Sequence, residues 1–348
     1  MGAPGDNPAQ AHARGDSGSA AEARLAIGPP LARVYLLLVL ATLLWGGGPV
    51  AGKLGLGAIP PVTMGLLRFS LAAAVLLALH WRRLPAWHSL SRHDLWMLLG
   101  LGIFGAFLNH VLFFAGLLFA PASHGALVAP TTVPIWTMLL AARVGGERVT
   151  RAQALGLLVC LAGVALVVQP GGGGTAATWT TLQGDLLLAL SSAAWSIYSV
   201  LSKMAMRRLS NEATLTYGMC IGCLFLAATA TIERPWVVVA RAPLLAWGTV
   251  LYLTVAMTLL AFFWWNLAIQ RLGAGRTAVF TNLVPIFGVA LAWLILGERL
   301  SRLQLLGGAL ALAGVWVCQG TGGLQAAWRH ASPGRGGVGT PTSRSGLP

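Results

Sequence analysis

The sequence predicts an all-α polytopic membrane protein with ten transmembrane helices, arranged as two inverted repeats of five helices. Hydrophobicity, the number of apolar runs and an internal repeat predict this fold. Of the 348 residues, 56% are hydrophobic and 9% are charged, and the mean hydropathy is +0.74. A soluble domain carries about 25% charged residues. Nearly every charge lies between apolar runs close to the roughly 20 residues that a membrane span needs.

The apolar runs divide into two sets of five. The Gly-rich stretch at 170–182 separates the sets, so we expect a first repeat at 34–169 and a second repeat at 183–319. The ends at 1–33 and 320–348 are rich in Gly, Ala, Pro and charge, which predicts disordered tails. The runs lie at roughly 34–52, 61–80, 95–117, 122–142 and 152–169, then at 183–203, 213–232, 244–268, 274–296 and 303–319.

The basic residues predict the direction of the chain in the membrane. If the N-terminus is cytoplasmic, about 17 Lys and Arg residues face the cytoplasm and about 5 face outward, with Arg68 on neither side. We therefore expect a multi-pass protein of the bacterial inner (plasma) membrane with both tails cytoplasmic. This topology also explains the net charge of +14, because the arginines are spread over loops. Nucleic acid is not an expected partner.

The two halves are copies of one unit. Val133–Val164 aligns with Val284–Val315 at a constant shift of 151, and about 17 of 37 positions from 128 to 164 are identical. A shift of 150 aligns Trp45 with Trp195 and Lys53 with Lys203, the only two lysines of the chain. Because each copy has an odd number of spans, the copies point in opposite directions, as in many secondary transporters.

These residues resemble the EamA family of ten-span bacterial permeases, within the drug/metabolite transporter superfamily. The resemblance covers about 34–319 and is carried by LLWGGGPVAGK, by PVTMGLLRFSLAA and by the block VPI…GER…Q…G…AGV that ends each half. It implies a secondary transporter that moves small polar metabolites by alternating access, with export of amino acids or related compounds favoured. Efflux of drug-like compounds and transport of nucleotide-linked sugars are alternatives on the same fold.

An enzyme is not expected, because the sequence lacks HExxH, a serine-nucleophile motif, a phosphate loop and a cluster of His with acids. A non-transporting scaffold fits the inverted repeat and the paired prolines less well. Cys220 and Cys223 have no second pair of metal ligands, so neither a metal nor a cofactor is expected. The expected partners are a small-molecule substrate, the lipid bilayer and, as a possible homodimer, a second copy of the chain.

Arg68 is the clearest candidate for substrate binding. It lies about 11 Å along the second span by the helical rise, where a charge is costly and usually faces a cavity. Acidic residues are predicted at span ends and in loops, so Arg68 has no expected acidic partner inside the membrane. Two interpretations stay open: it attracts a carboxylate or phosphate, or it holds helix-end carbonyls. The second half has no basic equivalent, because Gly218 or Met219 stands there.

The other candidates are polar or aromatic residues deep in spans. His110 is the only deep group expected to titrate near neutral pH, as a proton relay or as a hydrogen-bonded packing residue. With no deep carboxylate, facilitated diffusion is favoured over proton antiport. The remaining side chains either contact the substrate or serve helix packing. The predicted substrate-binding residues are Trp45, Arg68, Asn109, His110, Thr131, Trp195, Tyr198 and Asn282.

Glycine and proline predict hinges in three spans. Gly46, Gly47 and Gly48 loosen the first span, and Pro49 removes a backbone donor. Backbone exposed in this way is tolerated only beside a cavity or protein. Pro134 and Pro285 occupy equivalent positions of the repeat and are expected to kink spans four and nine.

Overall fold

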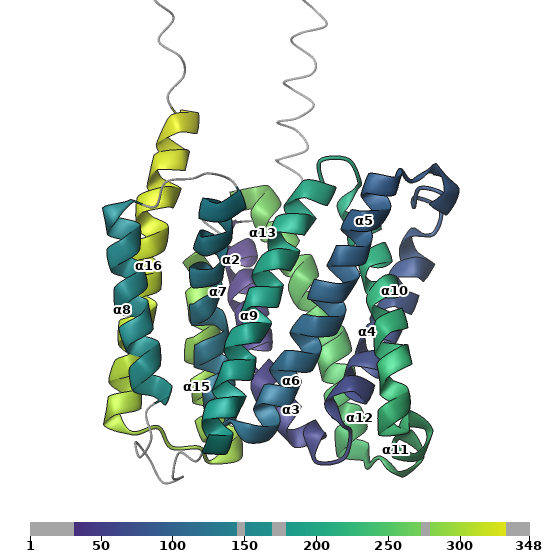
Figure 1. The fold of residues 1–348 in the computed structure, drawn as a ribbon, viewed down its shortest axis with the longest axis horizontal. Helices are drawn as coiled ribbons and strands as arrows, with labels where there is room; N and C mark the ends of the chain where they lie inside the picture. Colours follow the sequence, from purple (N-terminus) through teal and green to yellow (C-terminus); the bar gives the residue numbers. More distant parts are fainter. Residues whose placement is uncertain (1–30, 145–149, 169–178, 273–278, 332–348) are drawn as a thin grey trace, which may run out of the picture.

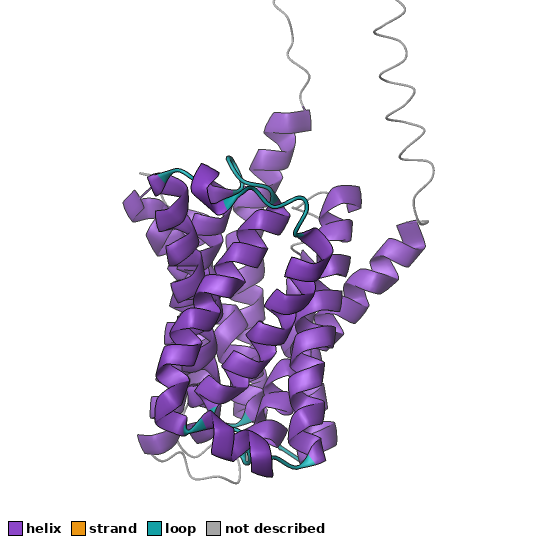
Figure 2. Cartoon of the chain, turned by 90° about the vertical axis from the view of Figure 1, so that its right-hand side faces the viewer, coloured by secondary structure: helices purple, strands orange, loops and turns teal. Residues whose placement is uncertain are grey.

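The computed structural model describes residues 31–144, 150–168, 179–272 and 279–331 (Figure 1). In these ranges the chain forms helices joined by loops, which confirms the predicted all-α class (Figure 2). The helices are α2 (Leu31–Gly46), α3 (Gly48–Leu56), α4 (Pro61–His80), η1 (Trp87–Ser89), α5 (Arg92–Leu101), η2 (Gly102–Leu108), α6 (Asn109–Phe119), α7 (Ala122–Val144), α8 (Arg151–Val168), α9 (Trp179–Ala205), α10 (Asn211–Ala230), η3 (Thr231–Glu233), α11 (Pro235–Arg241), α12 (Leu244–Leu251), η4 (Tyr252–Leu260), α13 (Ala261–Leu272), η5 (Val279–Asn282), α15 (Leu283–Leu296) and α16 (Arg302–Ala331).

Apart from the short helices η1 and α11, the described helices join end to end into ten rods. Five rods are composite: α2 with α3, α5 with η2 and α6, α10 with η3, α12 with η4 and α13, and η5 with α15. Six rods are long and apolar enough to cross a membrane, and shorter apolar helices lie at Ala154–Val167, Phe280–Leu296 and Arg302–Val317. The six are Leu31–Leu56, Pro61–His80, Arg92–Phe119, Trp179–Ser202, Asn211–Glu233 and Leu244–Trp265. The chain is a polytopic membrane protein.

The bundle has two distinct ends. Helix α2 begins and α16 finishes at the same end, which we call the terminal side; the other end is the opposite side (Figure 1). The first set of five rods starts with α2 at the terminal side, and the second starts with α9 at the opposite side (Figure 1). The two sets are therefore inverted, as predicted. Helix α16 continues to Ala331, beyond residue 319, where the last span was expected to finish.

Two rods contain a stretch of π-helix. Segment η2 covers Gly102–Leu108 in the third rod, and η4 covers Tyr252–Leu260 in the eighth. A shift of 150 places one on the other, so the irregularity belongs to the repeat unit. π-Helical turns are rare and concentrate at functional sites. The hydrophobic pattern did not predict them, because it marks the apolar run and not the hydrogen-bond register within it.

Helices α8 and α16 pack closely along their length because glycines face each other. A Cβ atom on Gly163 would overlap the backbone of Ala311 and Gly307, and one on Gly307 would lie 2.7 Å from the carbonyl oxygen of Gly163. Likewise, a Cβ on Gly314 would lie 2.6 Å from the Gly156 oxygen. Small residues let two backbones approach in a membrane. The identity of Gly163 and Gly314 across the repeat thus has a packing cause.

We expect Gly163→Ala to destabilise the protein by about 1–3 kcal/mol, because the added methyl meets rigid backbone atoms and forces the helices apart. Thermal unfolding of the purified protein measures this. Gly248→Ala is the matched control: it also lies in a helix, and a Cβ there meets nothing within 4 Å. Equal melting temperatures of the two variants would contradict the packing explanation.

Candidate functional site

A cavity of about 500 Å³ lies between the two sets of rods. Its volume is in the range of small-molecule sites. Both sets contribute to its wall, and all eight residues predicted to bind substrate line it. They are Trp45, Arg68, Asn109, His110 and Thr131 from the first set, and Trp195, Tyr198 and Asn282 from the second. Because all eight line one cavity, these side chains lie close to a common space. That they contact a substrate stays a prediction.

The cavity extends from the terminal side deep into the bundle. Its wall includes Thr214 in the first turn of α10 and Asn282 at the start of α15, both at the terminal side. It reaches Gly125 near the start of α7 at the opposite side. Beyond that point, fully buried apolar side chains such as Ile59 and Leu117 fill the space. This conformation therefore has its cavity toward the terminal side and is closed at the other.

Arg68 reaches the cavity from α4 and is 7% exposed. Its Nε donates a 3.0 Å hydrogen bond to the Thr258 hydroxyl, and its guanidinium carbon lies 4.9 Å from the Phe69 ring centre. The Thr258 hydroxyl in turn donates to the Leu253 carbonyl at 2.8 Å, so the π-helical segment η4 fixes the arginine. Among the described residues, neither terminal guanidinium nitrogen has a hydrogen-bond partner and no carboxylate pairs with it. Arginine thus keeps unused donors at the cavity wall.

His110 is packed between aromatic rings. It stacks on Phe114 with ring centres 4.3 Å apart and meets the edge of Phe69 at 5.4 Å. Its Nε2 donates to the Pro61 carbonyl at 3.2 Å, since a carbonyl oxygen can only accept. Nδ1 is buried and has no hydrogen-bond partner. This geometry fits the interpretation of His110 as a hydrogen-bonded packing residue, with one nitrogen left unsatisfied.

The polar candidates differ in whether their side chains already make hydrogen bonds within the protein. The amide nitrogen of Asn109 donates to the Ser191 carbonyl at 2.9 Å and so links α6 to α9. The Thr131 hydroxyl donates to the Leu127 carbonyl of its own helix, as the packing alternative expected. Asn282 precedes α15, and its side chain makes no capping hydrogen bond. Of these three, Asn282 is the least committed to the fold.

Aromatic rings from both repeats form much of the remaining wall. Trp45 meets Phe262 at 5.4 Å and Trp265 at 5.0 Å between ring centres, and its indole donates to the Met257 carbonyl at 3.0 Å. Trp195, which aligns with Trp45 in the repeat, lies 5.1 Å from Tyr198. A tryptophan near the end of span eight would be expected in the membrane interface. Trp265 instead lines the cavity.

The first span is interrupted where the hinge is predicted. Helix α2 stops at Gly46 and α3 starts at Gly48, with Pro49 in its first turn. A Cβ on Gly46 would lie 2.9 Å from atoms of α15, and one on Gly48 would lie 2.9 Å from the Met257 side chain. The glycines therefore permit close packing as well as a break. Movement at Gly46, Gly47, Gly48 and Pro49 stays a prediction.

The two predicted proline kinks have different settings. Pro285 lies in the first turn of α15, directly after the 3₁₀ segment η5, where a missing N–H group costs little. Pro134 lies within α7, and its side chain is outside the described set. In span nine a 3₁₀ segment thus meets an α-helix, and Pro285 follows that junction. Their role as hinges stays a prediction.

A profile of the EamA-like transporter family matches residues 32–169 and 182–318, one copy for each set of rods. The chain belongs to this family. The "Uncharacterized transporter YyaM" of Bacillus subtilis is 29% identical over 82% of the chain and 93% of its own length. A "Probable terminal-alkyne amino-acid exporter" of Streptantibioticus cattleyicolor is 29% identical over 82% and 93%. A solved structure with 24% identity covers 86% of the chain and 99% of its own, with a TM-score of 0.54, and supports the fold.

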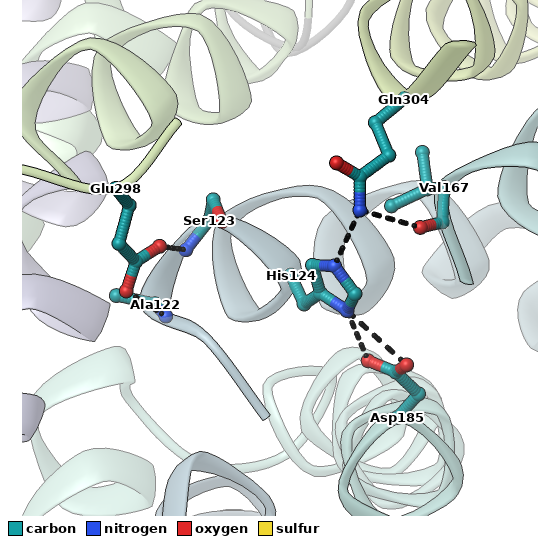
Figure 3. A network of polar contacts seen from close by, with 7 residues as sticks. All are labelled: Ala122, Ser123, His124, Val167, Asp185, Glu298 and Gln304. Carbon is teal, nitrogen blue, oxygen red and sulfur yellow. Dashed lines mark hydrogen bonds and ion pairs between the residues drawn. The ribbon is translucent and has the colours of Figure 1, made fainter. Parts of the chain in front are cut away.

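At the opposite side, the transporter is closed by polar contacts as well as by its apolar core. Glu298 accepts hydrogen bonds from the backbone N–H groups of Ala122 and Ser123, both at 2.8 Å (Figure 3). Glu233 accepts from the N–H group and hydroxyl of Thr63 at 2.7 and 2.8 Å. Each glutamate thus caps the start of a span in the other repeat. Carboxylates at span ends are predicted from the sequence, and this capping role is not.

The structure also corrects one expectation about titratable groups. Besides His110, it buries His124 and Asp185, which are 4% and 3% exposed and lie 2.9 Å apart. Asp185 is near the start of a long helix, where sequence alone suggests a solvated charge. Its partner is 61 residues earlier in the chain, and no local pattern reveals such a pair. The transporter therefore does contain a buried carboxylate beside a histidine.

Proposed function

We propose that this transporter exports amino acids or related small polar metabolites that carry a carboxylate. Transport would proceed by alternating access, with the substrate bound in the cavity between the repeats. The observation that carries the proposal is Arg68, a buried cation at the cavity wall with unused donors. The name of the Streptantibioticus relative, an amino-acid exporter, supports the same substrate class.

The chemistry of Arg68 favours an anion. A buried charge without an acidic partner is costly inside a membrane, and an anionic ligand offsets that cost when it binds. The planar guanidinium matches a carboxylate with two parallel hydrogen bonds. The amide of Asn282 and the rings of Trp45 and Trp195 line the same cavity and can contact the rest of the ligand. The wall thus offers one charged anchor and a largely apolar surround, as ligand sites generally do.

The charge pattern of the loops supports cytoplasmic termini in the bacterial inner membrane. With that orientation the terminal side is the cytoplasmic side. The cavity would then be loaded from the cytoplasm in the conformation described here, as an exporter requires. Arg68, His110 and the other predicted residues are proposed to bind substrate, and the glycines of the first span are proposed to move.

Ligand-dependent thermal stabilisation of the purified protein tests this proposal. A ligand that binds only the folded form at 100 times its Kd raises stability by about 2.7 kcal/mol. We expect stabilisation by one or more amino acids and none by the corresponding amino-acid amides, which lack the carboxylate. A hit is then followed by efflux measurements from liposomes.

Efflux of drug-like compounds is the second candidate, and the aromatic rings around Trp45 favour it because such rings attract organic cations. Arg68 opposes a cation in the same cavity. The stabilisation screen therefore includes amines and sugar phosphates. Stabilisation by cations alone would contradict the carboxylate proposal and favour drug-like substrates.

A further inference from the structure

His124 connects four helices at the closed end of the transporter. It lies in the first turn of α7, and its Nδ1 is 2.9 and 3.1 Å from the two carboxylate oxygens of Asp185 on α9 (Figure 3). Its Nε2 is 3.1 Å from the amide nitrogen of Gln304 on α16. That amide nitrogen also donates to the Val167 carbonyl of α8 at 3.2 Å. We call His124, Asp185, Gln304 and the Val167 carbonyl the His124 network.

The contacts of Gln304 fix which of its atoms faces the histidine. The Ser301 N–H group donates to the Gln304 Oε1 at 3.0 Å, so that oxygen is turned away from the ring. The Val167 carbonyl can only accept, so the atom beside it is the amide nitrogen. This nitrogen donates its second hydrogen toward His124 Nε2. His124 must therefore accept at Nε2 and donate at Nδ1, and the ring is neutral in this conformation.

We propose that His124 is a proton-binding site that controls the opposite end of the transporter. The neutral ring holds that end closed. A proton from water on the opposite side adds to the Nε2 lone pair and gives an imidazolium that donates from both nitrogens. The Gln304 N–H group then faces an N–H group, and their hydrogen bond breaks. Loss of the proton restores the bond.

Breaking this bond loosens the closed end because of the helices that it joins. Within the described residues, Gln304 provides the hydrogen bonds from α16 to both His124 and Val167. The Asp185 carboxylate keeps its contact with the imidazolium, so α7 stays tied to α9. The protonated network thus releases the ends of α16 and α8 beside His124 from α7, while deeper in the bundle the Cys160 thiol of α8 still donates to the Thr131 carbonyl of α7 at 3.2 Å. These two helices are already packed tightly on each other through their glycines.

The charged groups around His124 come from several helices. Helix α9 contributes Asp185, and the segment after α15 contributes Glu298, which caps the two residues before His124. Lys53 on α3 interacts electrostatically with Glu298.

Within the described part of the chain, the other polar groups at this end make no hydrogen bond to the His124 ring. Arg299 and Arg302 are exposed to solvent. Helix α8 contributes the Val167 carbonyl, which accepts from Gln304. His110 of α6 is bonded to the Pro61 carbonyl and takes no part in the network.

The sequence restricts this site to one end of the transporter. At the shifts that align the two repeats, His124 corresponds to Gly275, Asp185 to Tyr35 and Gln304 to Gln153. The glutamine is thus shared by both repeats, and the ionisable pair is present in one of them. Acid on the opposite side is therefore expected to act on that end alone. This inference concerns gating and does not depend on the identity of the substrate.

Distance measurements between two spin labels test the proposal without any substrate. Labels at Leu305→Cys and Trp179→Cys place one reporter near the start of α16 and one at the start of α9, which stays tied to α7; both positions are exposed at the opposite side. The native cysteines are replaced, and the protein is held in lipid nanodiscs. Between pH 8 and pH 5 we expect a longer distance to gain population, by up to about tenfold per pH unit, the limit for one proton. A distribution that does not change with pH would overturn the proposal.

Two variants assign the response to the network. His124→Asn can still donate to Asp185 and does not titrate in this range, so its distances are expected to be independent of pH; an unchanged pH response in this variant would overturn the proposal. Gln304→Glu places an acceptor opposite Nε2, so acid should now favour the closed end and reverse the sign of the response. Gln153→Glu adds the same charge at the repeat-related position and should keep the normal sign. Should Gln304→Glu fail to fold, His124→Asn alone decides.

Discussion

Arg68→Gln is expected to lower substrate transport by about 10- to 100-fold. A hydrogen bond to a charged group contributes about 1.5–3 kcal/mol, and each 1.4 kcal/mol corresponds to a factor of ten in binding. Glutamine retains a polar side chain at the cavity wall but cannot form a charged pair with a carboxylate. Efflux of a stabilising amino acid from liposomes measures the loss. The protein itself should be as stable as the parent or more stable, because a buried charge without an acidic partner has been removed.

Two further variants separate charge from position. Arg68→Lys keeps the charge and loses the planar pair of donors, so we expect transport between that of the parent and that of Arg68→Gln. Thr258→Val removes the hydroxyl that holds Nε and keeps the shape, so it should weaken transport less than the loss of the guanidinium. If Arg68→Gln instead lowers the melting temperature and leaves transport intact, the arginine serves the fold. That outcome would favour the other interpretation that the sequence left open.

The sequence predicts the wall of the cavity well because the repeat and the membrane both restrict it. Polar residues are costly inside spans, so Arg68, Asn109 and Asn282 stand out against an apolar background. A tryptophan at the same repeat position in each half, Trp45 and Trp195, adds a second signal. Hence all eight predicted side chains lie around one cavity although they come from six different rods.

The residues that the sequence does not reveal depend on pairing between distant segments. Thr258 is one threonine among many until the π-helical segment η4 turns it toward Arg68. His124 and Asp185 are near span ends, where solvated polar residues are common, and only the packing of α7 on α9 buries them together. Hydrophobic periodicity reports how each helix meets its surroundings. It does not report which helix is the neighbour, so such pairs become visible only in the folded structure.

Gly47→Ala is expected to destabilise the transporter by about 1–3 kcal/mol and to reduce transport. A Cβ at this position would overlap the Tyr252 hydroxyl, which donates a 2.7 Å hydrogen bond to the Leu44 carbonyl beside the helix break. The added methyl group therefore removes that bond and pushes η4 away from the first span. Thermal unfolding and liposome efflux measure the two effects separately.

The partner variant Tyr252→Phe separates packing from movement at the break. It removes the colliding oxygen and leaves the ring carbon 3.2 Å from the new Cβ, a contact that a small shift relieves. In a double-mutant cycle, the stability of Gly47→Ala with Tyr252→Phe should therefore be close to that of Tyr252→Phe alone. If stability recovers and transport does not, the glycine is needed for backbone freedom at the hinge, because alanine restricts the conformations that glycine reaches. If both recover, Gly47 serves only to accommodate Tyr252, and the predicted hinge at this residue is wrong.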